Sequence, residues 1–299
     1  MLKTNFKSGF VAIIGRPNVG KSTLLNHFLG TKVAIVTPKA QTTRNRMQGI
    51  LTTDEAQMVF VDTPGFHNAF NALGEYMNEA ALEALAGVDL VLLMVDASKR
   101  FDELDTKLID ILNESSMPKL VVYNKMDLIK NQEEFAALKD AYSTLKAKNS
   151  FEISAENHLG VDELLSEIVK LLPNGPQYYD EDELIDQSER FVVGEIIREK
   201  VLLLTEKEVP HSVAVVVEAM KQSDKQNLVN IQATIVVERP SQKAIIIGKG
   251  GAKIKEIGTA ARLDIASFLG QKVYLELFVK VEKDWRNQKR TLKEFGYQE

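Results

Sequence analysis

The sequence predicts an α/β domain, with a mostly parallel sheet and helices on both faces, followed by a small α+β domain. Between Phe10 and Leu172, short apolar runs alternate with amphipathic stretches, a pattern typical of parallel strands buried between helices. The turn-forming sequence Pro173–Pro176 interrupts it. Paired β runs and further helices follow. We therefore expect a first domain at 1–174, a linker at 175–187, and a second domain with a C-terminal extension at 188–299.

A length of 299 residues suits about two domains of ordinary size. The absence of cysteine excludes disulfides and cysteine-based zinc sites. Neither the start of the chain, Met1–Gly9, nor its most apolar window, Asp89–Ala97, is long and apolar enough for a signal peptide or a membrane span. These features predict a soluble protein.

The net charge of −5 is unevenly distributed along the chain. Residues 1–180 carry a net charge of −5, and residues 181–299 carry none in sum. Within the latter part, residues 240–299 carry +5. Nucleic-acid-binding domains are often basic overall, and this chain is not. Any such function must therefore use a local basic patch near the C-terminus.

In the first domain, apolar runs indicate strands and helical periodicity indicates helices. The expected strands are Phe10–Ile14, Gln57–Val61, Leu90–Val95, Lys119–Tyr123 and Ser150–Ile153. The expected helices are Lys21–Leu29, Leu73–Leu85, Glu103–Asn113, Glu133–Lys148 and Val161–Leu172.

In the second domain, the expected order of elements is α-β-β-α-α-β. Asp186 and Glu189 match a capping box for a helix that runs to about Thr205. The elements expected after it are the strands His211–Met220 and Leu228–Glu238, joined by the turn Gln222–Asn227, helices near Gly251–Ile257 and Ala260–Leu269, and the strand Lys272–Val281.

The segment Gly15–Ser22 matches the phosphate-binding pattern G-x-x-x-x-G-K-[ST] between an expected strand and an expected helix. Its glycines let backbone N–H groups surround phosphates, and the helix N-terminus favours their negative charge. Lys21 is expected to reach the β- and γ-phosphates, and the Ser22 hydroxyl to ligate Mg²⁺. The alternative is a glycine-rich loop with a chance lysine and serine, which this context disfavours. The expected phosphate-binding residues are Gly15, Arg16, Pro17, Asn18, Val19, Gly20, Lys21 and Ser22.

The motif Asp62-Thr63-Pro64-Gly65 ends the strand expected beside that of the phosphate loop. Asp62 would bind the metal through water, and the Gly65 N–H would contact the γ-phosphate. Asp-x-x-Gly alone is common in turns. Its position after a strand expected next to that of the phosphate loop makes it a strong signal.

The motif Asn124-Lys125-Met126-Asp127 ends another expected strand and identifies the base. Guanine offers N1–H and N2–H₂ as paired donors to the Asp127 carboxylate, whereas adenine lacks the 2-amino group. A site built on such a bond rejects the wrong base by factors of roughly 10⁴ or more. Asn124 would hold the loop and the N7 edge, and the Lys125 stem would cover the ring. Ser154-Ala155-Glu156, after the last strand, matches the position of a backbone N–H to guanine O6, and Ser154 and Ala155 are the expected binding residues.

The polar segment Thr37–Gly49 lacks a clear period and suits a switch loop ordered by γ-phosphate and Mg²⁺. Thr42 or Thr43 would complete the metal shell, the alternative being ordinary threonines in a solvated loop. In many GTPases a glutamine that orients the attacking water follows the Asp-x-x-Gly glycine, but Phe66 stands here. We therefore expect slow intrinsic hydrolysis. No arginine finger is obvious, which leaves three arginines open for that role: Arg16, Arg44 and Arg46.

Together, five segments resemble the Era-type branch of the translation-factor-related GTPases: Gly15–Ser22, Gln41–Arg44, Asp62–Gly65, Asn124–Asp127 and Ile153–Ala155. The resemblance implies that Thr43, immediately before the arginine, is the magnesium ligand. In related members, an asparagine at the position of Asn18 helps hold a potassium ion that does part of the work of an arginine finger. The expected catalytic residues are Lys21, Thr43, Gly65 and Asn18, and the expected metal ligands are Ser22, Thr43 and Asp62.

The sequence Gly248-Lys249-Gly250-Gly251 follows the apolar run Ala244–Ile247 in the basic part of the chain. Such a G-x-x-G loop is the KH signature, which clamps about four single-stranded nucleotides. The motif alone is a weak signal, and the surrounding α-β-β-α-α-β order strengthens it. The expected RNA-binding residues are Ile247, Gly248, Lys249, Gly250, Gly251, Lys253 and Ile254.

This second domain resembles a type II KH domain, so the whole chain resembles the Era family. The resemblance implies binding near the 3′ end of 16S ribosomal RNA and a role in maturation of the small ribosomal subunit. It also implies a monomeric, cytoplasmic protein with peripheral contact at the inner face of the plasma membrane. The charged stretch Lys280–Lys293 is a candidate surface for RNA or lipid head groups, although most such stretches are solvated faces.

Two rival interpretations remain open from the sequence. In one, the second domain of a regulatory GTPase docks protein instead of RNA, which the intact G-x-x-G loop and its lysines disfavour. In the other, the chain is a non-enzymatic RNA-binding assembly factor in which GTP is structural. The presence of Lys21, Ser22, Thr43 and Asp62 disfavours the second.

Overall fold

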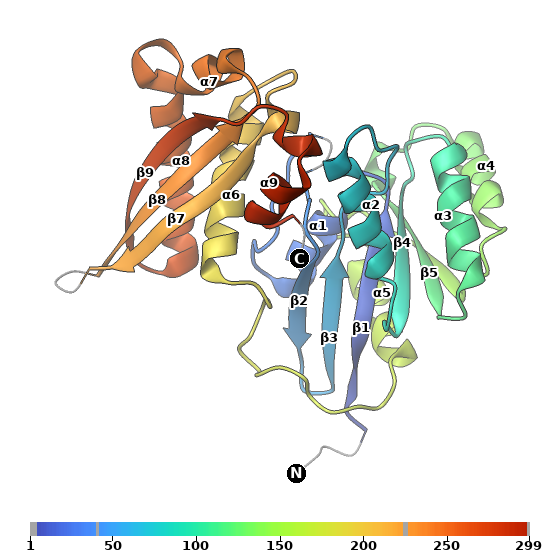
Figure 1. The fold of residues 1–299 in the computed structure, drawn as a ribbon. Helices are drawn as coiled ribbons and strands as arrows, with labels where there is room; N and C mark the ends of the chain where they lie inside the picture. The colour runs from blue at the N-terminus through green and yellow to red at the C-terminus, as the bar shows by residue number, and fades with distance from the viewer. Residues whose placement is uncertain (1–4, 40–41, 224–226, 298–299) are drawn as a thin grey trace. The chain divides into compact units, whose positions relative to one another are not determined.

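Figure 1 shows the computed structural model, which describes residues 5–39, 42–223 and 227–297. The chain divides into two compact units. The first unit contains Met1–Ala34, Thr43–Phe70 and Gly74–Asp186, and the second contains Ile35–Thr42, Asn71–Leu73 and Gln187–Glu299. Two short segments from the first quarter of the chain therefore belong to the second unit, which no sequence pattern indicated.

The first unit is built on a sheet of six strands, ordered β2-β3-β1-β4-β5-β6 in the described chain. Neighbouring strands are parallel except β2 and β3. The strands are β1 (Lys7–Gly15), β2 (Met47–Thr52), β3 (Ala56–Asp62), β4 (Leu90–Asp96), β5 (Lys119–Asn124) and β6 (Asn149–Glu152). All five expected strands are present within a few residues. The antiparallel edge strand β2 was missed, and it takes the last residues of the segment that we expected to be a loop.

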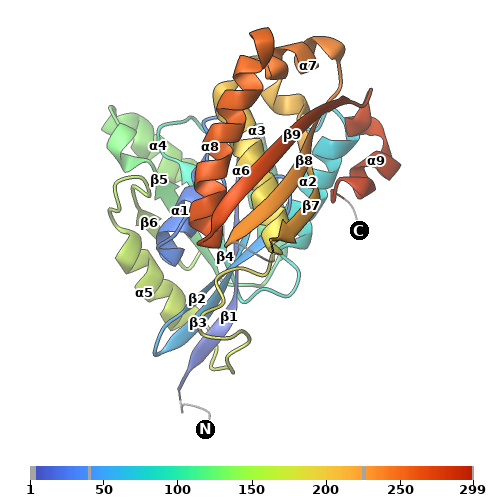
Figure 2. The ribbon, with the colours of Figure 1, turned by 90° about the vertical axis from the view of Figure 1, so that its left-hand side faces the viewer.

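Helices cover both faces of this sheet (Figures 1 and 2). They are α1 (Lys21–Leu29), α2 (Ala72–Glu83), α3 (Glu103–Glu114), α4 (Gln132–Tyr142) and α5 (Val161–Leu171). Helices α2, α3 and α4 share one apolar cluster with β1, β4 and β5. On the opposite face, Phe28 of α1 stacks on Phe60 of β3. The helix expected to reach Lys148 ends at Tyr142 instead. Leu145 is buried in the turn that follows, so the apolar pattern in the sequence continues past the end of the helix.

The residues that we expected to be a linker lie along the edge strand β2. Ile50 donates its N–H to the Leu184 carbonyl at 2.8 Å, and Gln48 donates its N–H to the Asp186 carboxylate at 3.0 Å. An unpaired sheet edge is a template for aggregation, so this segment protects β2. Because the Asp186 carboxylate accepts the Gln48 N–H, it is not the helix cap that we expected.

The second unit has a sheet of three described strands, with β7–β8 antiparallel and β8–β9 parallel. Helices α6 and α8 lie side by side on one face of it (Figure 2). The elements are α6 (Glu189–Leu204), β7 (Ala214–Gln222), β8 (Leu228–Val237), α7 (Pro240–Ile247), α8 (Ala252–Leu269), β9 (Lys272–Val281) and α9 (Lys289–Glu294). The α-β-β-α-α-β order is as expected up to the C-terminal extension.

Three details of the second unit differ from the expectation. Ser188 caps α6 by accepting the Phe191 N–H at 3.2 Å. The apolar run before the G-x-x-G loop is the helix α7, which Pro240 begins at a position that proline favours. The two helices expected beyond the loop are one continuous helix, α8. The turn expected at Gln222–Asn227 lies partly outside the described residues.

The C-terminal extension folds back into the core of the second unit. Trp285 is fully buried, donates to the Ser212 carbonyl at 3.0 Å and packs against Tyr297. Arg286 forms an ion pair with Glu238 at 2.5 Å. Part of the charged stretch 280–293 is therefore structural. Among the described residues, none of the helices has the length and apolar character that crossing a membrane requires.

Candidate nucleotide and nucleic-acid sites

The phosphate loop connects β1 to α1 at the carboxyl edge of the sheet, where open α/β sheets bind ligands. Lys21, the first residue of α1, is buried and donates its ammonium to the carbonyls of Gly15 and Arg16 at 3.1 and 3.0 Å. These bonds hold the ammonium within the loop. The loop residues 15–22 therefore form one continuous structure around a lysine, as the motif predicted.

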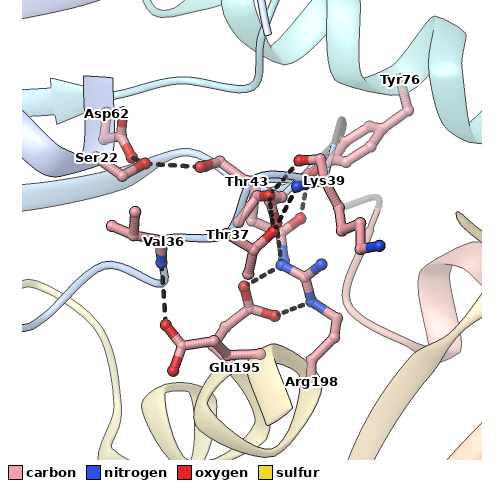
Figure 3. Close-up of polar contacts among 12 residues, drawn as sticks. Ser22, Val36, Thr37, Lys39, Thr43, Asp62, Tyr76, Glu195 and Arg198 are labelled. Atoms are coloured by element: carbon pink, nitrogen blue, oxygen red, sulfur yellow. Dashed lines mark hydrogen bonds and ion pairs between the residues drawn. The ribbon is translucent and has the colours of Figure 1, made fainter. Parts of the chain in front are cut away.

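Three oxygen-bearing side chains converge beside this loop (Figure 3). The Ser22 hydroxyl donates to Asp62 at 2.8 Å and lies 2.9 Å from the Thr43 hydroxyl. The second carboxylate oxygen of Asp62 is buried and has no hydrogen-bond partner among the described residues. Hydroxyl and carboxylate oxygens are the ligands that Mg²⁺ prefers. The donor set, with its orphaned carboxylate oxygen, fits a magnesium ion.

Burial shifts the pKa values of the two charged groups of this cluster in opposite directions. Burial raises the pKa of Asp62 to about 6, although Lys21 and the hydrogen bond from Ser22 lower it. Burial lowers the pKa of Lys21 to about 8, against the attraction of Asp62. A bound group of opposite charge stabilises the charged form of each side chain, the ammonium of Lys21 and the carboxylate of Asp62. The site thus suits a ligand that brings an anion to Lys21 and a cation to Asp62.

The chain after β3 passes close to the phosphate loop. A Cβ on Gly65 would lie 2.5 Å from the Pro17 Cα, so only glycine fits there. Thr63 donates its hydroxyl to the Ile13 carbonyl at 2.8 Å, and Pro64 is buried. Phe66 donates its N–H to the Gly15 carbonyl and buries its ring in the cluster under α2, α3 and α4. Its side chain is therefore directed into the core.

The base-recognition motif joins three loops. Asn124 donates its amide to the Val19 carbonyl at 2.8 Å and accepts the Ala155 N–H at 2.9 Å. It thereby links the phosphate loop to the loop after β6. Both groups of its side chain serve this link, so the structure supports the loop-holding part of the role that we expected. The Ala155 N–H, which belongs to the segment expected to donate a backbone N–H to guanine O6, is bonded to Asn124 here.

The other residues of the motif lie beside it. Asp127 is exposed and accepts the Ser154 hydroxyl at 2.6 Å, and Met126 donates its N–H to the Ile153 carbonyl. Lys125 donates to the Asn18 carbonyl at 2.6 Å and to Asp96 at 2.7 Å. The sequence reasoning missed Asp96, which ends β4. Its position at the end of a buried strand, next to the phosphate-loop strand, is a signal that could have identified it.

Two of the three arginines that we left open are held in the fold. Arg16 forms ion pairs with Asp102 and Asp105 near the start of α3, at 2.7 and 3.0 Å. Arg44 is buried, whereas Arg46 is exposed. The two carboxylates neutralise the Arg16 guanidinium, which disfavours it as an arginine finger.

The threonines of the expected switch segment differ in environment. Thr43 faces Ser22, whereas Thr42 is buried and its hydroxyl lies 2.7 Å from that of Thr37. The structure therefore brings Thr43, rather than Thr42, beside Ser22 and Asp62, and the metal role of Thr43 stays a prediction. Gln41, which contributed to that resemblance, lies outside the described residues.

The G-x-x-G loop joins α7 to α8 in the second unit. Gly248 has a φ of 70°, and a Cβ there would lie 2.7 Å from that of Lys253. A Cβ on Gly250 or Gly251 would meet nothing within 4 Å, so the loop is open for a phosphate backbone to approach. Lys249 is exposed, and Lys253 pairs with Glu256 at 2.8 Å. The remaining expected residues, Ile247 and Ile254, are half-buried beside the loop.

These features define a P-loop GTPase with a second, KH-type domain. The model of the 50S ribosome-binding GTPase family matches residues 10–125, and that of the KH domain matches residues 208–286. The chain belongs to the Era family of GTPases. It is 52% identical to GTPase Era of Syntrophus aciditrophicus (strain SB), over 98% of this chain and 96% of that protein. It is also 52% identical to GTPase Era of Leuconostoc citreum (strain KM20), over 100% of this chain and 99% of that one.

Two solved structures have the same fold over nearly the whole chain. One is a variant of Aquifex aeolicus Era bound to GDP·AlF₄⁻, and the other is Era in complex with MgGDPNP and nucleotides 1506–1542 of 16S ribosomal RNA. Each is 41% identical to this chain, has a TM-score of 0.93, and covers 98% of this chain and 99% of its own.

Proposed function

We propose that this GTPase is a Mg²⁺-dependent switch that binds 16S ribosomal RNA near its 3′ end and assists maturation of the small ribosomal subunit. The convergence of Ser22, Thr43 and Asp62 beside Lys21 supports the first part most directly. The G-x-x-G loop supports the second, together with the relative that was solved with 16S nucleotides.

In this proposal Ser22 and Thr43 would hold Mg²⁺ directly, and Asp62 would hold it through water. When bound, the ion neutralises charge on the β- and γ-phosphates. Lys21 and the backbone N–H groups of the loop bind the phosphates, and the Gly65 N–H contacts the γ-phosphate. Asp127 selects guanine, while Asn124 and Lys125 fix the loops around it. Phosphate release from GTP with and without EDTA tests the metal requirement, and release that is unaffected by EDTA would contradict it.

The position of the usual water-orienting glutamine is occupied by Phe66, whose side chain is buried in the core and cannot orient a water. Of the three arginines left open for the finger role, Arg16 is held by two carboxylates and Arg44 is buried. We therefore propose that Asn18 helps bind a potassium ion beside the phosphates. GTP turnover should be faster in potassium than in sodium buffer at equal ionic strength, and Asn18→Ala should abolish the difference. Equal turnover in the two buffers would refute this part of the proposal.

The RNA-binding part of the proposal places single-stranded RNA against Lys249, Gly250 and Gly251. An oligoribonucleotide that covers the 3′ end of 16S ribosomal RNA should bind more tightly than a scrambled one of equal length. Equal affinity for both would leave only charge-driven binding, and no binding would favour the rival in which the KH fold docks protein.

From the same family resemblance we propose a monomeric, cytoplasmic protein that contacts the plasma membrane only at its inner surface. Light scattering after size-exclusion chromatography tests the monomer. Co-sedimentation with vesicles that contain anionic lipids tests the membrane contact, which absence from the pellet would contradict.

A further inference from the structure

Helix α6 carries two consecutive charged residues, Arg198 and Glu199, that are almost fully buried. Charged side chains are rarely buried to this extent unless they are paired. Both residues contact the segment Ile35–Thr42, which belongs to the same compact unit as α6. This segment immediately precedes Thr43.

Arg198 holds the end of the segment (Figure 3). Its Nη2 donates to the backbone carbonyl of Thr42. The same guanidinium donates to the Glu195 carboxylate from Nε at 2.7 Å and from Nη2 at 2.5 Å. A two-point contact of this kind fixes the plane of the guanidinium. Glu195 thus orients Arg198 toward the Thr42 carbonyl.

Glu199 holds the beginning of the segment. It accepts the Val36 N–H at 3.1 Å, and the Lys200 ammonium lies 3.0 Å from its other oxygen. Helix α6 therefore binds the segment at both ends, with a cationic and an anionic side chain that are adjacent in sequence.

The described residues between these ends also form hydrogen bonds with one another. The Thr42 hydroxyl donates to the Lys39 carbonyl at 2.7 Å, and the Thr37 hydroxyl accepts the Lys39 N–H at 3.1 Å. Thr42 thus has its side chain engaged inside the segment and its carbonyl engaged by Arg198. A single peptide bond joins that carbonyl carbon to the nitrogen of Thr43, whose hydroxyl lies 2.9 Å from that of Ser22.

We propose that Arg198 is a positioning residue for the GTP-bound state: by fixing the Thr42 carbonyl, it presents Thr43 to the magnesium site. The inference rests on the proposed role of Thr43 as a metal ligand. Switch segments are ordered by the γ-phosphate and its Mg²⁺ and are released when that phosphate is lost. Arg198 should therefore favour binding of GTP over binding of GDP, because only the former uses Thr43.

The position of Arg198 also gives it a part in regulation. Helix α6 packs against α8, the helix that begins directly after the G-x-x-G loop. A ligand that shifts or stiffens α6 would change how firmly the Thr42 carbonyl is held, and the effect must be reciprocal. Loss of Arg198 should consequently reduce the effect of RNA on GTP affinity, while RNA affinity without nucleotide is preserved.

The test compares Arg198→Met, which keeps the apolar stem, with Arg198→Lys, whose ammonium can still reach a carbonyl. The full-length variants are titrated with fluorescent GDPNP and with GDP in the presence of Mg²⁺. The affinity of Arg198→Met for GDPNP should fall about tenfold, as expected for a lost charged hydrogen bond, and its affinity for GDP should stay within about twofold of the wild type. Arg198→Lys should recover part of the loss. Arg190→Met, an exposed arginine on the same helix, is the matched control.

Two results would overturn the inference: equal losses for GDPNP and GDP, which indicate a purely structural role, or no loss for either. Should Arg198→Met fail to fold, Arg198→Lys and Glu195→Gln carry the same comparison, since both weaken the contact without removing the side chain. Thr43→Ala separates this inference from the proposed function. If Thr43→Ala leaves GDPNP affinity unchanged, the metal role of Thr43 is wrong. If Thr43→Ala lowers GDPNP affinity but Arg198→Met leaves it unchanged, the metal role stands and the positioning role of Arg198 is wrong.

Discussion

We propose that Asp127 selects the base; it is exposed at the end of its loop and accepts the Ser154 hydroxyl at 2.6 Å. A carboxylate accepts from both N1–H and N2–H₂ of guanine, whereas an amide can accept only once and donates elsewhere. Xanthine carries a carbonyl oxygen in place of the 2-amino group. An amide therefore matches xanthine better than guanine.

We predict that Asp127→Asn lowers GTP affinity by about a hundredfold or more and raises XTP affinity, because the pairing of donors and acceptors is reversed at one position. Competition with labelled GDP measures both affinities. The exposed Asp140→Asn on α4 serves as control. Unchanged GTP affinity in Asp127→Asn would remove Asp127 from the base site.

The burial of the Phe66 side chain leads to a second prediction. Its ring is part of the core under α2, α3 and α4, and its N–H is bound by Gly15. We predict that Phe66→Gln does not accelerate GTP hydrolysis and lowers the free energy of unfolding by roughly 2–4 kcal/mol, through lost burial and a buried amide. Single-turnover hydrolysis and urea unfolding test this, with Phe66→Leu as the apolar control. A faster Phe66→Gln variant would show that the side chain turns toward the phosphates.

Sequence patterns were enough to propose most of the candidate site, because its residues follow strand ends in fixed motifs that the fold brings together. Partners that meet only in the folded chain were not predictable in this way. Asp96, which binds Lys125, belongs to no motif that names its partner. The same holds for Asp102 and Asp105, at the start of α3, which bind Arg16. The burial of Arg198 likewise depends on a segment far away in the sequence.

At the level of elements, the strands with continuous apolar runs and the helices α1, α2, α3 and α5 were predicted closely. The strand β2 was not, because as a half-polar edge strand it lacks that run. The helix α7 was taken for an apolar run since its eight residues are too few to show a period. The two helices expected after the G-x-x-G loop are the single helix α8, which packs on β9.

The G-x-x-G loop allows a prediction with a matched glycine. Gly250, Gly251 and Gly270 all have positive φ and open space where a Cβ would stand. Gly270 lies at the C-terminal end of α8, outside the G-x-x-G loop, and therefore serves as the control. Gly250→Asp/Gly251→Asp should abolish oligoribonucleotide binding, since two carboxylates would repel the phosphates that the open loop admits. Gly270→Asp should cost stability through the same backbone strain and keep RNA affinity. Filter binding and thermal unfolding of both variants decide the point, and RNA binding that survives the double substitution would refute the KH assignment.

For the whole molecule, the C-terminal extension stabilises the second unit. Trp285 is fully buried and bonded to Ser212. Trp285→Ala should destabilise that unit by about 3–5 kcal/mol while GDP affinity at low temperature is kept. Denaturant unfolding, followed alongside GDP binding, measures both. A variant as stable as the wild type would show that the extension contributes little to the fold.

We propose that nucleotide binding and RNA binding control one another in this GTPase with a KH domain. Coupling between two sites is a reciprocal free energy, so the decisive measurement is the affinity of the full-length protein for a 16S 3′-end oligoribonucleotide with Mg²⁺–GDPNP and with GDP. We predict that the two affinities differ several-fold, and that the oligoribonucleotide changes the ratio of GDPNP to GDP affinity by the same factor. Equal RNA affinity in the two nucleotide states would contradict the account.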